Sequence, residues 1–281
     1  MPIEVFLMVL GAALVHASWN ALVKADGDRL SLIKLMSGTQ IGVSLCLIPF
    51  VATPASDCWV FLLASSVLNT GYMLTLNRAY QSGDLSLVYP FARGVAPLLV
   101  AIISIVALGE SLTHTNQMAV LLIGLGITSL ALSHRSTSSI DLRPMGLAIA
   151  TGVFIAGYTI VDGLGARMAG SAHGYVVWQS LLTSINIAAS AQWLQQGRQA
   201  PMGKRTRNTG IAVGIMSYGS SWIVIWALTL APLALVSALR ETGVVFAVII
   251  GVVILREQLS LSRLASIATT LIGTTVLKIG R

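Results

Sequence analysis

The pattern of apolar and polar residues divides the chain into long hydrophobic stretches joined by short polar connections. The hydrocarbon core of a bilayer is roughly 30 Å thick, and a helix needs about 20 residues to cross it. The longest connections, 134–143 and 196–208, are too short to form a domain. We therefore predict an all-α integral membrane protein with ten transmembrane helices. The predicted spans are 3–24, 31–53, 58–80, 85–108, 115–133, 144–166, 171–195, 209–230, 233–255 and 261–279.

Composition supports a membrane protein and excludes a soluble enzyme. Of the 281 residues, 55% are hydrophobic and 10% are charged, whereas a soluble domain has about 25% charged residues. The first apolar stretch lacks the basic leading segment and the cleavage site of a signal peptide, so we expect it to remain as the first helix. The two cysteines, Cys46 and Cys58, indicate neither a disulfide framework nor a metal site. We expect no metal ion and no cofactor.

Most of the basic residues lie in the connections rather than in the spans. Seventeen lysines and arginines contribute to a net charge of +7, which in a soluble protein would suggest a nucleic-acid partner. In a membrane protein such residues instead set the orientation, because cytoplasmic loops carry the excess of positive charge. Twelve of the 17 lie in or beside the odd-numbered connections, which favours cytoplasmic odd connections and external termini. The expected partners are the lipid bilayer and a small-molecule substrate, and no nucleic acid; the oligomeric state stays open.

An internal repeat relates the two halves of the chain. A shift of 147 positions aligns 85–130 with 232–277 without a gap. The aligned charged residues are Arg93 with Arg240 and Glu110 with Glu257. We predict a first five-helix repeat at 1–133, a linker loop at 134–143 and a second five-helix repeat at 144–281. Because five is odd, the second copy enters the membrane upside down, and such inverted repeats are typical of secondary transporters.

The fourth span and its connection also resemble a known family. The run GDLSLVYPFARGVAPLL at 83–99, GESLT at 109–113 and REQLS at 256–260 are similar to segments of the EamA-type transporters of the drug/metabolite transporter superfamily. The resemblance covers essentially the whole chain. It implies ten helices in two inverted repeats, a central cavity, and transport of small polar metabolites such as amino acids, sugar derivatives or organic anions. It also implies cytoplasmic termini, in contrast to the charge count, so the orientation stays open.

Two further motifs resemble one subgroup of that superfamily. They are HASWNALVK at 16–24 and YPFARG at 89–94, which look like a subgroup associated with phosphonate-utilisation genes. Such an association concerns the neighbourhood of genes rather than chemistry. It adds phosphonates to the candidate substrates.

Two arginines lie near the middle of predicted spans, where a charged side chain costs at least a few kcal/mol. Arg93 and Arg240 could offer planar, bidentate donors to a carboxylate, phosphate or phosphonate of the substrate. Tyr89 lies one helical turn before Arg93 and shares its face. Alternatively, each arginine forms a structural ion pair: Arg240 has Glu241 and Asp162 as candidate partners, whereas Arg93 has no adjacent acid.

Other polar residues in the spans complete the predicted site. On the first span His16 could donate a hydrogen bond, carry a coupling proton because the pKa of histidine is near neutral, or serve only as an interhelical hydrogen-bond partner. Asp162 could bind an amine, relay a proton or neutralise an arginine. The predicted substrate-binding residues are Arg93, Tyr89, Arg240, His16, Asn20, Trp19 and Tyr158. The residues predicted for ion or proton coupling or for charge pairing are Asp162 and Glu241.

Weaker signals come from polar and aromatic residues on other spans. These could line a cavity, pack in the core or form an interfacial belt. They are Asn69, Tyr72, Trp178, Gln179, Asn186, Tyr218, Trp222 and Trp226. We expect Glu110 and Glu257, at the ends of spans, to cap loops or the N-terminus of the next helix.

These observations favour a secondary transporter that moves a small anionic or zwitterionic metabolite across the bacterial inner membrane by alternating access, with export as one direction to consider. The chain lacks the GxxxxGK[ST] motif, so an ion gradient, exchange or the substrate's own gradient would supply the energy. A membrane enzyme would need a polar catalytic cluster, and only His16 is a mid-span histidine, so we predict no enzyme and no catalytic residue. The alternative is a non-transporting membrane sensor or a channel-like protein.

Overall fold

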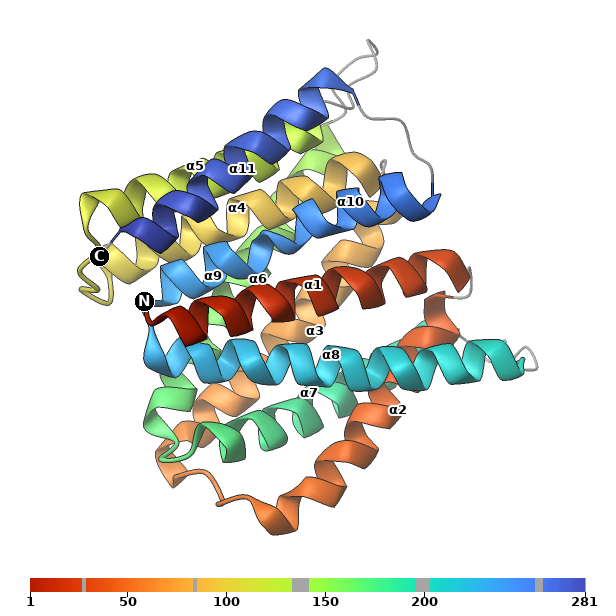
Figure 1. Cartoon of the computed structure of the whole chain (residues 1–281). Coiled ribbons are helices and arrows are strands. Elements are labelled where there is room, and N and C mark those ends of the chain that lie inside the picture. The colour runs from red at the N-terminus through yellow and green to blue at the C-terminus, as the bar shows by residue number, and fades with distance from the viewer. Residues whose placement is uncertain (27–28, 83–84, 133–141, 196–202, 256–259, 281) are drawn as a thin grey trace.

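A computed structural model of the chain describes residues 1–26, 29–82, 85–132, 142–195, 203–255 and 260–280, and these residues form an all-helical bundle (Figure 1). The first half contains α1 (Ile3–Asp26), α2 (Arg29–Leu47), the short 3-10 helices η1 (Ile48–Phe50) and η2 (Ser56–Cys58), α3 (Trp59–Ser82), α4 (Leu85–Val106) and α5 (His114–Leu132). The second half contains α6 (Leu142–Met168), α7 (Ala172–Gln195), α8 (Lys204–Leu230), α9 (Leu233–Glu241), α10 (Gly243–Leu255) and α11 (Leu261–Ile279). Each of the ten predicted spans corresponds to one helix, except that the ninth is divided into α9 and α10.

Some helices begin earlier than the apolar pattern predicts. The helix α6 begins at Leu142 rather than at 144, and α8 begins at Lys204 rather than at 209. The apolar pattern marks only the part of a helix in hydrocarbon, whereas the helix continues into the headgroup region, where lysine and arginine reach the aqueous interface. Most of the predicted linker at 134–143 lies outside the described residues, and its last two positions belong to α6.

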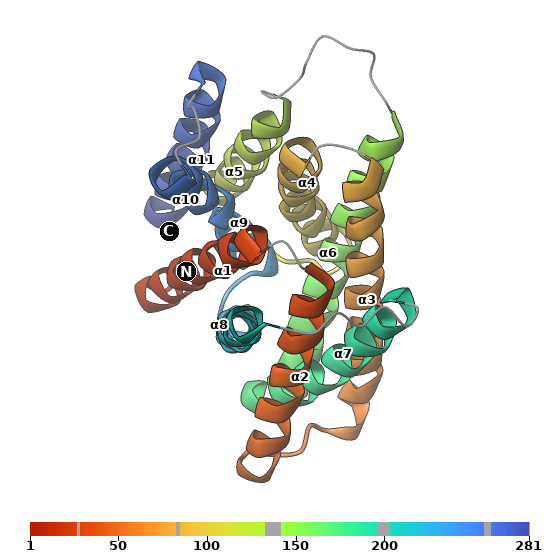
Figure 2. The same cartoon turned by 90° about the vertical axis from the view of Figure 1, so that its right-hand side faces the viewer.

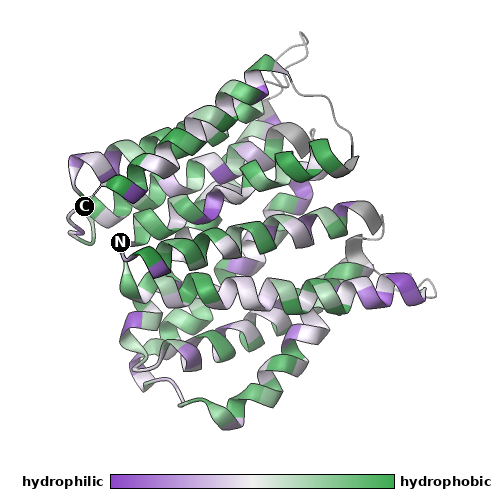
Figure 3. Ribbon diagram, viewed as in Figure 1, coloured by the Kyte–Doolittle hydropathy of each residue, from purple (hydrophilic) through white to green (hydrophobic). Residues whose placement is uncertain are grey.

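The outer surface of the bundle is suited to lipid. Seven helical segments in the described part of the chain are long and apolar enough to cross a membrane. Large apolar side chains such as Val60, Ile102 and Val253 are exposed rather than buried. Figure 3 shows hydrophobic residues along most of the helices and hydrophilic ones at helix ends, as at the start of α8. The protein is therefore a multi-pass membrane protein.

Several helix contacts of one half recur between the equivalent helices of the other, as an inverted repeat requires. The helices α1 and α6 are equivalent in the repeat. The helices α3 and α4 pack on α6, and their equivalents, α8 and the pair α9 and α10, pack on α1. The equivalent helices α2 and α7 pack on each other, as do α5 and α11. Figures 1 and 2 show α5 and α11 at one side of the bundle and α2 and α7 at the other. The fold thus has the predicted architecture of two inverted five-helix repeats.

Two glycines that the repeat aligns lie in the contact between α5 and α11. A Cβ atom on Gly126 would lie 2.9 Å from the backbone nitrogen of Thr270, and one on Gly273 would lie 2.9 Å from the backbone nitrogen of Ile123. Small residues allow membrane helices to approach closely, and van der Waals contact then drives their association. The two glycines therefore permit the contact that joins the halves at this side.

We expect Gly126→Ala to destabilise the fold by about 1–3 kcal/mol, because the new methyl group would meet the backbone of α11 and push the helices apart. The midpoint of thermal unfolding of the purified protein in detergent would fall. Gly11→Ala is the matched control, because a Cβ atom at Gly11 meets nothing within 4 Å. Equal midpoints for the two variants would show that the close contact between α5 and α11 does not contribute to stability.

Candidate functional site

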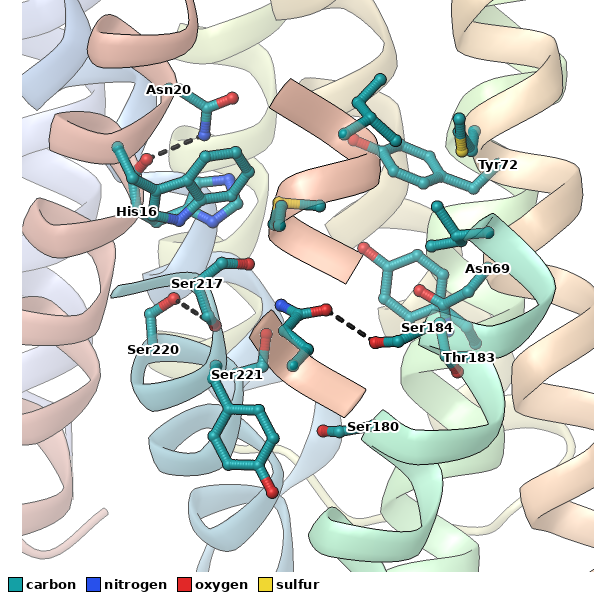
Figure 4. Close-up of a pocket in the computed structure, with 18 of the residues that line it drawn as sticks. His16, Asn20, Asn69, Tyr72, Ser180, Thr183, Ser184, Ser217, Ser220 and Ser221 are labelled. Carbon is teal, nitrogen blue, oxygen red and sulfur yellow. Dashed lines mark hydrogen bonds between the residues drawn. The ribbon is translucent and has the colours of Figure 1, made fainter. Parts of the chain in front are cut away.

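A cavity of about 270 Å³ lies between the two halves and is lined by α1, α2, α3, α4, α6, α7, α8 and α9. Figure 4 shows that α1, α3, α7 and α8 each direct polar side chains toward a common space. Apart from the charged groups, the polar lining residues are Asn20, Gln40, Asn69, Tyr72, Asn77, Tyr80, Tyr89, Tyr158, Gln179, Ser180, Thr183, Ser184, Ser217, Tyr218, Ser220 and Ser221. A pocket with many hydrogen-bonding groups inside an apolar bundle is suited to a small polar ligand.

The cavity extends toward one end of the bundle. It is lined by Val23 and Tyr80 near the ends of α1 and α3, and by Leu32 and Tyr89 near the starts of α2 and α4. We call this the mouth end; the C-terminal ends of α1 and α3 and the N-terminal ends of α2 and α4 lie there. At the opposite, closed end lie both termini and the α4–α5, α6–α7 and α8–α9 connections (Figure 1).

The fold brings the predicted binding residues together. All seven line the cavity, and so does Asp162, whereas Glu241 lies behind Arg93 and does not. Four of the weaker candidates also line it: Asn69, Tyr72, Gln179 and Tyr218. The other four do not, because their side chains have other contacts or pack in the core: Trp178 with Trp59, Asn186 with Ser66, Trp222 with His173, and Trp226 in the core. The roles of the lining residues in binding stay predictions.

Arg93 is held by groups of the protein. Its Nη1 donates to Oε2 of Glu241 at 2.8 Å, and its Nη2 lies 2.7 Å from Nε2 of His16. Because a guanidinium group has no acceptor, Nε2 of His16 must accept this bond, so His16 is neutral and carries its proton on Nδ1. The ring of Tyr89 lies 5.1 Å from the guanidinium carbon. The sequence indicated no adjacent acid for Arg93, but the fold supplies Glu241 from the other half.

Arg240 is less fully compensated than Arg93. Its Nη2 donates to the hydroxyl of Tyr158 at 2.8 Å, while its Nε lies 3.8 Å from Oε1 of Glu241. This Glu241 oxygen has no hydrogen-bond partner among the described residues. The Arg240 side chain is 16% exposed and the Arg93 side chain 4%. One carboxylate thus serves two arginines, and the excess positive charge is on the side chain that faces the cavity more openly.

Asp162 places a carboxyl group on the cavity wall, one helical turn from Tyr158. Its Oδ1 accepts a hydrogen bond from the hydroxyl of Tyr175 at 3.1 Å, and the carboxylate is almost completely buried. Within the part of the chain that the structure describes, Asp162 forms no ion pair. The cavity therefore presents the guanidinium group of Arg240, which shares Glu241 with Arg93, and the carboxyl group of Asp162, which forms no ion pair among the described residues.

The ninth span is interrupted at Thr242, directly after Arg240 and Glu241. The backbone N–H and the hydroxyl of Thr242 both donate to the carbonyl of Leu239, and a new helix begins at Gly243. A Cβ atom on Gly243 would lie 3.0 Å from the carbonyl oxygen of Ala13, so glycine allows α1 to approach here. The backbone of Thr242 stays in the right-handed helical region, so the interruption is a local tightening of the helix rather than an unwound segment. The sequence analysis predicted one continuous helix, because the apolar pattern does not change across the break.

The sequence analysis also missed much of the polar wall. Gln40, which was not predicted, accepts a hydrogen bond from Ser184 at 2.8 Å, and the likewise unpredicted Thr183 accepts one from Gln179 at 3.2 Å. The sequence pattern that could have indicated this wall is a stripe of hydroxyl and amide groups at helical spacing on the seventh span. A hydroxyl can also bond to its own helix backbone, so this stripe alone did not separate a cavity wall from ordinary packing.

Comparisons with known proteins agree with this architecture. The model of the EamA-like transporter family matches residues 142–279, the second half of the chain. A solved structure described only as "Crystal structure of protein" has a similar fold. The match covers 98% of this chain and 98% of that chain, with a TM-score of 0.77 and 18% sequence identity. At that identity the likeness shows the fold alone. No curated protein matches the chain. The predicted resemblance is confirmed for the second half, and the matched family is one of transporters rather than enzymes.

We expect Arg93→Met to destabilise the protein by roughly 3–5 kcal/mol, because it removes the close partner of a buried carboxylate. The midpoint of thermal unfolding in detergent measures the change. Arg93→Met with Glu241→Gln should regain much of the loss, since the unpaired charge is then also gone. Arg78→Met, on the exposed part of α3, is the control. A single variant as stable as the parent, or a double variant no better than the single one, would contradict a stabilising role for the pair.

Proposed function

We propose that the chain, whose second half matches the EamA-like transporter family, is a secondary transporter that carries a small polar metabolite across a cell membrane by alternating access. The observation that carries this proposal is the polar cavity between two inverted halves, which extends to one end of the bundle. Inverted repeats can exchange conformations, so that a central site opens to each side in turn. The membrane is proposed to be the bacterial inner membrane, with export as one direction to test.

The charges in the cavity support an anionic or zwitterionic substrate. Arg240 is the better anchor for an acidic group, because the guanidinium group of Arg93 already donates to Glu241 and His16. Asp162 could bind an amine of a zwitterion. Tyr89, Asn20 and Trp19 would add hydrogen bonds or ring contacts. Carboxylates, phosphonates and amino acids fit this combination of groups.

Energy coupling is proposed to depend on one of the two buried acids. Glu241 has an oxygen without a hydrogen bond among the residues described, and Asp162 has no ion pair there. Either group could take up a proton as the substrate binds or leaves. Exchange of one substrate for another would need neither group, so transport with and without a proton gradient separates these possibilities.

A channel-like protein or a non-transporting sensor is the alternative. The closed end argues against an open channel, because Leu228 and Leu233 are completely buried beyond the last lining residues of α6 and α8. The described charges also form a compact cluster rather than the ring typical of a selectivity filter.

Binding of a substrate would raise the midpoint of thermal unfolding, because a ligand stabilises the state that it binds. We expect a panel of phosphonates, amino acids and organic acids to contain at least one compound that raises the midpoint for the parent protein. We expect Arg240→Gln to weaken the apparent affinity for that compound by at least tenfold, since the acidic group loses its cationic anchor.

The controls for this experiment are Arg240→Lys and Arg78→Gln. The first keeps a charge without the planar fork and should lose less affinity, and the second alters an exposed arginine outside the cavity. An unchanged affinity in a folded Arg240→Gln protein would refute the role of Arg240 as the anchor.

A further inference from the structure

A second polar network lies outside the cavity, at the closed end, and centres on Arg167. Near the C-terminus of α6, its guanidinium group donates to three oxygens, each at 2.9 Å. The acceptors are the carbonyl of Leu228, the carbonyl of Ala231 and Oε1 of Glu110. The other carboxylate oxygen of Glu110 accepts the backbone N–H of Leu233, the first residue of α9, at 3.0 Å. Glu110 thus caps a helix from the other half, rather than its own loop or the next helix. Its repeat equivalent, Glu257, lies outside the described residues.

This network connects helices that also line the cavity. Glu110 is attached to α4 because its N–H donates to the carbonyl of Ser104 at 2.9 Å. Leu228 belongs to α8, and Leu233 begins α9. Together with α6, the network therefore joins four of the eight helices around the cavity. Two of its segments are connections between helices, whose positions have to change if the closed end opens.

The network lies directly behind the closed end of the cavity. On α6 the last lining residue is Asp162, and Arg167 follows five positions later, roughly 7.5 Å along a helix. On α8 the last lining residue, Ile225, precedes Leu228 by three positions. The buried side chains of Leu228 and Leu233 belong to one apolar cluster here. An apolar layer and then a polar network thus separate the cavity from the closed end.

We propose that Arg167 and Glu110 form a latch that holds the closed end shut and that opens in each transport cycle. This inference rests on the proposed function, because a latch needs a state in which the cavity opens at that end. The Arg167 side chain is 33% exposed, so water can replace its bonds when the helices part. The bonds of Arg167 connect α6 to the α4–α5 and α8–α9 connections. Loss of the Arg167 side chain would release all three contacts, and loss of Glu110 would release its bond to Arg167 and its bond from the N–H of Leu233.

The proposal is tested by the reaction of one cavity cysteine with a membrane-impermeant maleimide applied from each side of the membrane. Ser221→Cys supplies the reporter, because Ser221 lines the cavity and is exposed. The native thiols are first removed by Cys46→Ser and Cys58→Ala. Cells and inside-out vesicles present the two sides, and Ser111→Cys in a separate protein, on the α4–α5 connection, identifies the side of the closed end.

With the latch intact, we expect the reporter to react mainly from the mouth end. Arg167→Gln and Glu110→Gln should each raise the rate of reaction from the closed end at least tenfold and lower the rate from the mouth end. Asp57→Asn is the matched control, because it removes an exposed charge near the closed end without touching the latch. Arg167→Lys keeps a charge beside Glu110 but cannot make all three contacts, so its effect should be intermediate.

Unchanged rates from the closed end in both latch variants, in proteins that keep the parent's unfolding midpoint, would overturn the latch. An equal increase with Asp57→Asn would also overturn it, because the effect would then follow charge rather than contact. If a latch variant is poorly folded, the milder Arg167→Lys variant decides, because it keeps the positive charge beside Glu110: faster reaction from the closed end than in the parent supports the latch, and the parent's rate contradicts it. The assay needs no substrate, so a failure of the latch is distinguishable from a failure of transport.

Discussion

A charge inside a bilayer requires compensation, and the contacts around Arg93 show how this fold supplies it. Glu241 provides the opposite charge at 2.8 Å, and His16 accepts a second bond from the same guanidinium group. The three side chains come from α4, α9 and α1, so they meet only when both halves of the bundle are assembled. The pair therefore contributes to the contact between the halves as well as to charge balance. The broken ninth span begins its second helix two residues after Glu241.

The compensation of Arg93 determines what is left for a ligand. Since Glu241 lies closer to Arg93 than to Arg240, the excess positive charge is at Arg240, beside Tyr158. The carboxyl group of Asp162 lies one turn farther along α6. A polar cavity between inverted halves is a site that small relative movements of the halves could expose to either side. At the closed end, the network of Arg167 and Glu110 joins α4, α6, α8 and α9, which also line the cavity. The opening of the latch and the rearrangement of the site would therefore occur in the same conformational change.

Much of the architecture was predictable, because the span length and the odd-numbered repeat are imposed by the bilayer and by topology. The charged residues of the site were also predictable: Arg93, Arg240 and Asp162 are conspicuous in apolar surroundings. Glu241 was also named as a candidate partner of Arg240, but not of Arg93, because it is 148 residues from Arg93 and only packing brings them together. The break at Thr242 was missed because it depends on a hydroxyl bond and on the close approach of α1, neither of which changes the apolar pattern. The contacts of Arg167 depend on backbone carbonyls, which no side-chain pattern indicates.

The central claim is that the cavity is the binding site of a carrier, and counterflow through the purified protein in liposomes tests it most directly. Liposomes loaded with an unlabelled ligand from the binding panel would be diluted into the same labelled ligand. The account predicts transient accumulation of label that saturates with ligand concentration and is absent from liposomes containing Arg240→Gln. Linear, unsaturable flux that does not depend on the internal ligand would contradict a carrier and indicate a channel.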